Sequence, residues 1–185
     1  MVAELAEAVE TRHPWTRGHA HRVVGLAVAA ARTLGWSDEA LGNVRAGSLL
    51  HDVGKLAVPT DVLAKPGPLT AMELAEVRRH PTYGAVLVSS LPGARRALPS
   101  ILHHHERWDG TGYPGRIAGE AIPAEARLVC IADAYDAMTS HRPYRATLSI
   151  RAALEELRVC AGTQFDPVIA EACIEAWSAR LKLAV

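Results

Sequence analysis

Apolar residues recur at intervals of three and four along most of this chain, and no stretch alternates as a β-strand does. The segment 18–34 is the clearest example. Its apolar face carries Val23, Leu26, Ala27, Ala30 and Leu34. The chain has 185 residues, 49% of them hydrophobic, and no internal repeat. The pattern therefore predicts an all-α fold, a single-domain helical bundle over residues 1–185.

Capping residues and prolines divide the chain into segments. Ser37, Thr70 and Asp166 are suited to helix N-caps, and Pro81 and Pro167 to first helical positions. We expect helices over about 2–12, 18–34, 37–52, 70–79, 81–92, 94–106, 124–139, 150–160 and 166–181. We expect loops over 56–68 and 107–123.

Charge and cysteine content exclude several functions. Lys plus Arg and Asp plus Glu number 20 each, so nothing favours general binding to duplex nucleic acid or to an anionic membrane. Cys130, Cys160 and Cys173 lie in helical patterns without zinc spacing and are expected to be free thiols. No apolar run approaches the roughly 20 residues of a membrane helix, and residues 1–10 do not resemble a signal peptide. We expect a cytoplasmic protein that does not contact a membrane.

The dipeptide His51-Asp52 ends an apolar helical stretch. An imidazole nitrogen and two carboxylate oxygens at one corner suit a divalent ion, and a carboxylate can bridge two ions. The pair alone is weak, because a capping Asp beside an ordinary His has the same sequence. Lys55 follows closely and can direct its charge toward a bound phosphate.

Two further histidines are candidate ligands with ordinary alternatives. His19 lies four residues before Val23 and shares its apolar face, although a hydrogen-bonded core histidine would do the same. His80 precedes Pro81 at a predicted helix start, where it could equally be a solvated helix end. His21 lies about 200° around the helix from His19 and is expected near the surface.

Periodicity separates the three consecutive histidines that end the segment 94–106. His104 and His105 follow Ile101 by three and four residues, so both extend its apolar face inward, whereas His103 points elsewhere. An exposed metal-scavenging tract is the alternative, but such a tract would not continue an apolar stripe.

Asp133 lies four residues after Val129 in an otherwise apolar helical segment, and Asp136 follows three residues later. An aspartate among apolar residues is costly unless it is paired or bound to metal. Asp133 is therefore a candidate ligand.

The inward-facing candidates come from separate helices and are His19, His51, Asp52, His80, His104, His105 and Asp133. The set suits two ions of the iron, manganese or cobalt type bridged by Asp52, is too poor in oxygen for magnesium or calcium, and lacks the cysteines of structural zinc. Two adjacent cations would activate a shared water for hydrolysis of a phosphodiester or phosphomonoester. Lys55, Arg142 and Arg145 would then stabilise phosphate charge.

These residues lie in motifs that resemble the HD-GYP family, over about Glu10 to Ile174. The motifs are His51-Asp52-Val53-Gly54-Lys55, His80-Pro81, His104 to Pro114 with its Gly112-Tyr113-Pro114 end, Ala132-Asp133, Arg142-Pro143-Tyr144 and Phe165-Asp166-Pro167. The resemblance implies a helical phosphodiesterase that opens cyclic di-GMP to linear pGpG, and in some members to GMP, by a metal-bridging hydroxide.

By the same resemblance, the candidate His and Asp residues fall on the family's metal positions and Lys55 on its phosphate-facing lysine. Tyr113, Arg142 and Arg145 fall where the family meets the dinucleotide. Asp136 falls on a further acidic position near the site, which we group with the substrate contacts.

Three departures bear on this expectation. Trp15 stands where some members carry a glutamate that holds a third ion, so we expect two metals. Gly115-Arg116-Ile117 replaces the common Asp-Gly-Leu, and Arg145 replaces a frequent lysine, which changes the geometry of phosphate contact. None of these departures removes a ligand.

Two other functions remain open. One is hydrolysis of another nucleotide, such as a mixed cyclic dinucleotide, by the same ligands. The other is a regulatory module that binds cyclic di-GMP without hydrolysis. Family members are often joined to receiver or sensor domains, so a regulatory partner is also an expectation of the resemblance. A homodimer is a separate expectation.

Overall fold

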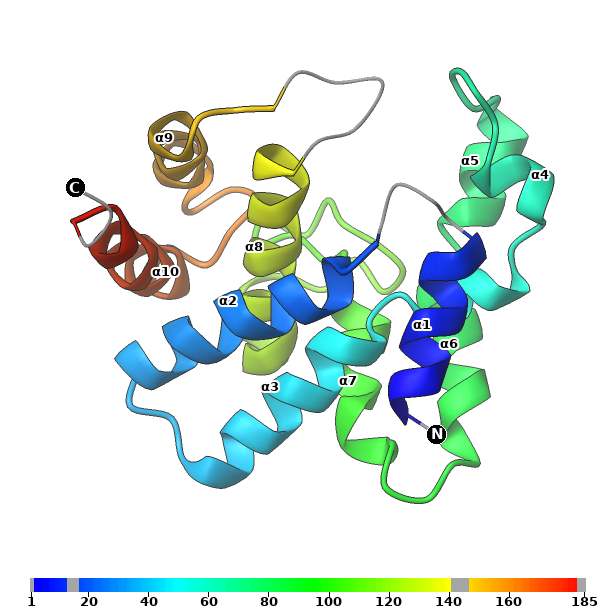
Figure 1. Cartoon of the computed structure of the whole chain (residues 1–185), viewed down its shortest axis with the longest axis horizontal. Helices are drawn as coiled ribbons and strands as arrows, with labels where there is room; N and C mark the ends of the chain where they lie inside the picture. Colours follow the sequence, from blue (N-terminus) through cyan, green and yellow to red (C-terminus); the bar gives the residue numbers. More distant parts are fainter. Residues whose placement is uncertain (1, 13–16, 141–146, 183–185) are drawn as a thin grey trace.

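The computed structural model describes residues 2–12, 17–140 and 147–182, which form α-helices and short 3-10 helices and contain no β-strand (Figure 1). The all-α prediction is confirmed. The α-helices are α1 (Val2–Arg12), α2 (His19–Thr33), α3 (Asp38–Leu50), α4 (Thr60–Leu63), α5 (Ala71–Val77), α6 (His80–Ser89), α7 (Leu98–His103), α8 (Ala124–Thr139), α9 (Ile150–Cys160) and α10 (Pro167–Lys182). The 3-10 helices are η2 (Val53–Ala57), η3 (Arg95–Ala97) and η4 (Gly119–Ala121).

The predicted caps begin their helices. The Ser37 hydroxyl accepts from the Ala40 amide at the start of α3. Thr70 and Glu73 form a capping box at α5, with the Glu73 carboxylate accepting from the Thr70 amide. Asp166 accepts from two amides at the start of α10. Local hydrogen bonds therefore set these helix starts.

The structure corrects three predicted segments. The expected loop 107–123 contains η4, and the other two are 56–68 and 94–106. Residues 56–68 are not all loop, because η2 extends into them and α4 follows Pro59. Bonds from Lys55 N to Asp52 O and from Val58 N to Lys55 O tighten η2. The predicted helix 94–106 is divided into η3 and α7, since Pro99 favours a new helix start.

Two apolar clusters make the core. The larger joins α2, α8, α9, α10 and the first half of α3, and there the buried Trp177 indole donates to Leu26 O at 3.1 Å. The smaller joins α6 and α7 with Ala46 and Leu50 from the second half of α3. In Figure 1, α9 and α10 lie on one side of the molecule and α4 to α6 on the other. The corner after α3 therefore lies at the end of a helix that both clusters share.

Two glycines allow η2 to pack closely against α6. A Cβ atom added at Gly54 would lie 1.8 Å from the carbonyl oxygen of His80 and 2.4 Å from the amide nitrogen of Gly84. A Cβ at Gly84 would in turn lie 2.7 Å from the side chain of Ile101. Residue 54 must therefore be glycine, because backbone atoms of α6 occupy the place where a Cβ atom would lie.

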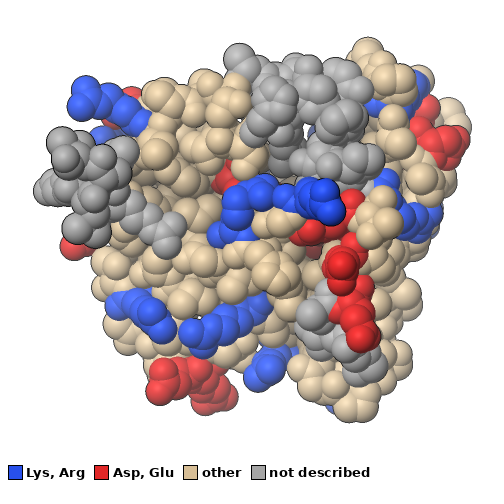
Figure 2. Space-filling view, viewed as in Figure 1, with Lys and Arg blue, Asp and Glu red and all other residues tan. Residues whose placement is uncertain are grey.

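Neither sign of charge covers the face drawn in Figure 2, where acidic and basic side chains are interspersed. This agrees with the equal numbers of acidic and basic residues. Within the described ranges, no helix combines the length and the apolar character needed to cross a membrane.

Candidate metal centre

All of the candidate ligands except Asp133, which lies within α8 (Ala124–Thr139), are at helix ends that meet at one place. His19 is the first residue of α2, His51 and Asp52 follow α3, and His80 is the first residue of α6. His104 and His105 directly follow α7. All except His105, Asp52 and Asp133 are almost fully buried, and Asp52 has 9% of its surface exposed. His21 is exposed and His103 lies outside the cluster.

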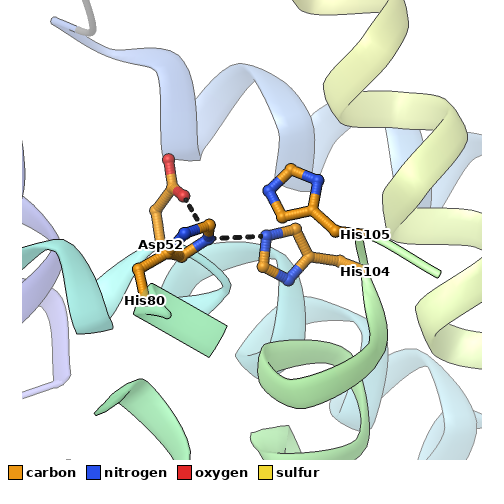
Figure 3. Close-up of side chains that lie close together, drawn as sticks. All are labelled: Asp52, His80, His104 and His105. Atoms are coloured by element: carbon orange, nitrogen blue, oxygen red, sulfur yellow. Dashed lines mark hydrogen bonds and ion pairs between the residues drawn. The ribbon is translucent and has the colours of Figure 1, made fainter. Parts of the chain in front are cut away.

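Two groups of donor atoms share Asp52. One group is Asp52, His80, His104 and His105, and the other is His19, His51 and Asp52, with the donor atoms of each group within 4.8 Å of one another. Figure 3 shows the first group, in which three imidazoles from two parts of the chain turn toward the carboxylate. His80 Nε2 lies 3.4 Å from Asp52 Oδ1, and His51 Nε2 lies 3.5 Å from Asp52 Oδ2.

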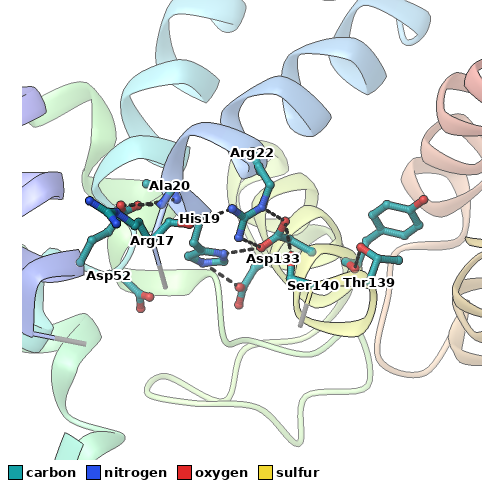
Figure 4. Close-up of polar contacts among 12 residues, drawn as sticks. Arg17, His19, Ala20, Arg22, Asp52, Asp133, Thr139 and Ser140 are labelled. Carbon is teal, nitrogen blue, oxygen red and sulfur yellow. Dashed lines mark hydrogen bonds and ion pairs between the residues drawn. The ribbon is translucent and has the colours of Figure 1, made fainter. Parts of the chain in front are cut away.

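Asp133 of α8 adjoins the second group. Asp133 Oδ1 lies 3.3 Å from His19 Nε2. Burial raises the pKa of Asp133, but the hydrogen bond with His19 and the charges nearby outweigh burial and hold this pKa well below its usual value. In Figure 4 its side chain lies beside His19. A charged carboxylate therefore completes the second group of donors.

Backbone carbonyls fix the tautomers of three histidines. Nδ1 of His51 donates to Ser48 O at 2.8 Å, and Nδ1 of His80 donates to Val77 O at 2.8 Å. Nδ1 of His104 donates to Ser100 O at 3.0 Å. Because a carbonyl only accepts, each Nδ1 carries the hydrogen and the neutral ring turns a bare Nε2 inward.

The inward nitrogens crowd one another. Nε2 of His80 and His104 are 3.2 Å apart, and Nε2 of His19 and His51 are 3.3 Å apart. In the first pair both Nδ1 atoms already carry hydrogens, so two lone pairs of neutral rings would face each other. A shared cation relieves that repulsion, and the donor set therefore fits a metal.

Burial keeps the first group in its ligand form. It lowers the pKa of His80 and of His105 to about 3 although Asp52 opposes this, and it holds the pKa of His104 well below the usual value. Asp52 stays ionised: burial favours protonation, but Lys55 and the surrounding histidines outweigh it and depress its pKa. Neutral imidazoles around a carboxylate are ready to bind a cation without losing a proton.

Lys55 and Tyr113 contact different members of the cluster. Lys55 Nζ donates to Asp52 Oδ2 at 2.6 Å. The ring of Tyr113 stacks on His105, with centroids 4.7 Å apart and planes at 21°. Arg142 and Arg145, expected to contact substrate, lie outside the described residues, as does Trp15.

Asp136 occupies a different position from the substrate contact we expected. Its side chain is 4% exposed, and its Oδ2 accepts from His19 Nδ1 at 2.7 Å. The guanidinium of Arg22 donates to both of its oxygens, at 2.7 and 3.1 Å, and Ser140 Oγ donates to Oδ1. Figure 4 shows Arg22 beside His19. The carboxylate is thus fully engaged and orients a candidate ligand, which leaves little of it for a substrate.

Replacing Asp136 with asparagine is expected to weaken divalent metal binding by about 10- to 100-fold, because His19 loses the charged acceptor that orients its ring. Titration of metal-free protein with manganese measures this. Ser140→Ala is the control, since it removes one neutral donor to the same carboxylate and should change affinity only slightly. Unchanged affinity in Asp136→Asn would show that Asp136 does not position His19.

The metal-free protein is expected to be most stable near pH 6.5. Burial disfavours charge on His19, but hydrogen bonds from its ring to Asp133 and Asp136 raise its pKa to about 9. Because the pKa of His19 in the folded state exceeds the unfolded value of 6.5, protonated His19 stabilises the fold fully below pH 6.5. This stabilisation is lost progressively as the pH rises to about 9. His80 and His105, with a pKa of about 3, stabilise the fold above pH 6.5 and lose that effect as pH falls.

Urea midpoints of metal-free protein at pH 5, 6.5 and 9 test this profile. A midpoint that rose or fell steadily across the three would contradict it. His21→Gln, at an exposed histidine, should leave the profile unchanged.

One buried acid in the HD-GYP-like motif had no role in the sequence interpretation. Glu106 is 2% exposed, and its Oε1 accepts from the Gly115 amide at 2.5 Å. Its Oε2 is buried without a hydrogen-bond partner among the described residues. Glu106 therefore ties the loop that carries Tyr113 to the end of α7. Its place directly after two ligands was the only signal in the sequence.

The chain is therefore an all-helical domain in which two groups of candidate metal ligands share the carboxylate of Asp52. Residues 4–169 match the family model described as HD domain. The chain belongs to the HD domain family and, by its motifs and relatives, to the HD-GYP group within it.

Curated relatives extend beyond this chain. The cyclic di-GMP phosphodiesterase response regulator RpfG of Xanthomonas campestris is 40% identical over 175 residues, which cover 94% of this chain and 46% of the relative. The 3′3′-cGAMP-specific phosphodiesterase 2 of Vibrio cholerae is 37% identical over 182 residues, covering 96% and 34%. The chain thus spans less than half the length of these relatives.

Solved structures share the fold. A cyclic GMP-AMP specific phosphodiesterase of V. cholerae aligns with a TM-score of 0.71 and 22% identity, over 96% of this chain and 49% of that one. The HD domain of the Listeria monocytogenes phosphodiesterase PgpH, solved with cyclic-di-AMP, aligns with a TM-score of 0.67 and 19% identity, over 96% and 95%. These likenesses concern the fold alone.

Proposed function

We propose that this chain is a metal-dependent cyclic dinucleotide phosphodiesterase that acts on cyclic di-GMP. The observation that carries the proposal is the pair of donor groups joined by Asp52, because a shared carboxylate is suited to two adjacent cations. The names of the relatives at 37–40% identity support the substrate class.

We further propose two divalent ions of iron or manganese. Five imidazoles with two aspartates are rich in nitrogen, which suits these metals better than magnesium or calcium. The ligands assigned to them are His19, His51, Asp52, His80, His104, His105 and Asp133. Trp15 provides no carboxylate for a third ion.

The chemistry that the ions supply when bound is a water of lowered pKa and neutralisation of phosphate charge. The chain's own residues prepare the corner. Asp52 holds its charge between the two donor groups. The hydrogen bonds from Nδ1 of His51, His80 and His104 to backbone carbonyls keep the Nε2 atom of each ring pointing inward. Lys55 donates to Asp52 and can instead direct its ammonium group toward a phosphate oxygen.

Hydrolysis at this corner would add a water oxygen to phosphorus and break the bond to the 3′ oxygen, giving linear pGpG. A second hydrolysis would give GMP. Tyr113, stacked on a proposed ligand, borders the space that the dinucleotide would enter. Arg142 and Arg145 remain proposed substrate contacts.

We also propose a cytoplasmic location and regulation by a receiver or sensor domain, in the same chain or a partner. A relative that is 40% identical is named a response regulator, and this chain covers 46% of it. A homodimer is a separate proposal.

Anaerobically prepared protein loaded with iron or manganese tests the function. It should linearise cyclic di-GMP, and chromatography should separate pGpG from GMP. Parallel reactions with 3′3′-cGAMP and cyclic di-AMP establish the base preference, since relatives of both cyclic di-GMP and cGAMP type match this chain. Binding of cyclic di-GMP without turnover under either metal would instead support a regulatory module.

A further inference from the structure

A surface arginine contacts the tyrosine that stacks on one of the proposed ligands. Arg78 caps the C-terminal end of α5, two residues before His80, and its guanidinium lies over the ring of Tyr113, 5.5 Å from the centroid. Tyr113 itself stacks on His105. The three side chains form a series of contacts from a half-buried candidate ligand to an exposed cation.

Arg78 differs from its neighbour in what it contacts. Arg79 also lies over a tyrosine ring, that of Tyr83 at 5.0 Å, but its guanidinium pairs with Glu76 at 3.3 Å. Within the described parts of the chain, the guanidinium of Arg78 has no hydrogen bond and no ion pair. Its donors are therefore available to a ligand while its plane rests on Tyr113.

Two other cations beside the candidate ligands, among the described residues, already donate to carboxylates. Lys55 donates to Asp52, and Arg22 donates to Asp136. A cyclic dinucleotide carries two phosphates, each with one negative charge. The phosphate under attack meets the ions and Lys55, but the other phosphate needs a cation some distance from the metal corner. Arg142 and Arg145 are proposed substrate contacts that lie outside the described residues. Among the described ones, Arg78 has the charge, the planar donors and the exposed position that this phosphate requires.

Building on the proposed function, we propose that Arg78 binds the phosphate of the cyclic dinucleotide that is not being hydrolysed. Tyr113 holds the guanidinium in place through the ring contact. The contact makes Arg78 a determinant of substrate class, because it strengthens the binding of substrates that have a second phosphate and not of single phosphodiesters.

Two substrates separate this role from general damage to the site. In manganese-loaded protein, Arg78→Ala should lower kcat/KM for cyclic di-GMP by about 10- to 100-fold, mostly through KM, because a charge-assisted contact is lost. Hydrolysis of bis(p-nitrophenyl) phosphate, which has one phosphate, should change less than about twofold. Arg79→Ala is the matched control and should leave both reactions unchanged. Arg78→Lys should restore part of the loss.

Further measurements distinguish the alternatives. Equilibrium binding of cyclic di-GMP to metal-free protein should weaken about tenfold in Arg78→Ala and not in Arg79→Ala. Equal losses with cyclic di-GMP and cyclic di-AMP support a phosphate contact, whereas a loss confined to guanine substrates would overturn it in favour of base reading. Equal losses with bis(p-nitrophenyl) phosphate would show that Arg78 acts only through Tyr113 and His105.

A double-variant comparison adds an independent readout. If Arg78 touches the phosphate, Arg78→Ala still weakens binding in a Tyr113→Phe background, which keeps the ring that holds the guanidinium. No further effect there contradicts the proposal. The proposed function fails separately, when the wild-type protein hydrolyses bis(p-nitrophenyl) phosphate but no cyclic dinucleotide. In that case binding to the metal-free protein still tests Arg78.

Discussion

Replacing Asp52 with alanine is expected to lower turnover of cyclic di-GMP by about a thousandfold or more, equivalent to about 4 kcal/mol of activation free energy. Asp52 is the one residue common to both donor groups, so its loss removes a ligand from each. The remaining histidines are neutral donors, and the site would lack the negative charge of Asp52 that helps to balance the charge of the cations. Metal content measured after gel filtration should fall together with activity.

Asp52→Asn and Asp61→Ala complete this experiment. Asparagine keeps the shape of the side chain but not its charge, so it should also lose most activity. Asp61 is an exposed acid of α4, and its removal should change neither metal content nor turnover. Full metal content with wild-type activity in Asp52→Ala would rule out a bridging role.

Replacing Gly54 with alanine is expected to destabilise metal-free protein by about 3 kcal/mol or more, because the new methyl group meets the backbone of α6. The nearest atom, His80 O, would lie 1.8 Å away and cannot rotate aside as a side chain could. The strain can be relieved only by moving η2 from α6, which separates Asp52 from His80. Thermal unfolding should show a midpoint lowered by roughly 6–12 °C, and the variant should bind metal weakly.

Gly25→Ala is the matched control for this substitution. Gly25 lies in the exposed face of α2, and a Cβ there would meet no atom within 4 Å. Alanine should stabilise the helix by about 0.5–1 kcal/mol. A Gly54→Ala protein as stable as wild type would mean that η2 and α6 do not pack as closely as the structure has them.

Local sequence signals specified most of the helices. Caps such as Ser37 and Thr70 act on amides three residues away, so their effect can be judged without the fold. The break between η3 and α7 was not predicted, although Pro99 is suited to a position near a helix start. Helix α4 was not predicted either, because it is too short to show a period.

The candidate ligands were accessible to sequence reasoning because helical periodicity gives direction. His104 and His105 lie in the cluster and His103 outside it, on the sides that their spacing from Ile101 indicated. The roles of Asp136 and Arg78 depend on partners far along the chain, Arg22 and Tyr113. No period within one helix contains that information, so only the folded structure relates them.

The donors beside the shared carboxylate come from opposite sides of the molecule. His19 and Asp133 belong to helices of the larger apolar cluster, whereas His80 and His104 belong to those around the smaller one. Bound ions would therefore cross-link two halves that otherwise meet along α3 and between α7 and α8. Withdrawal of metal would then expose the seam to proteases, and the supply of metal in the cell would govern how long the protein survives as well as how fast it works.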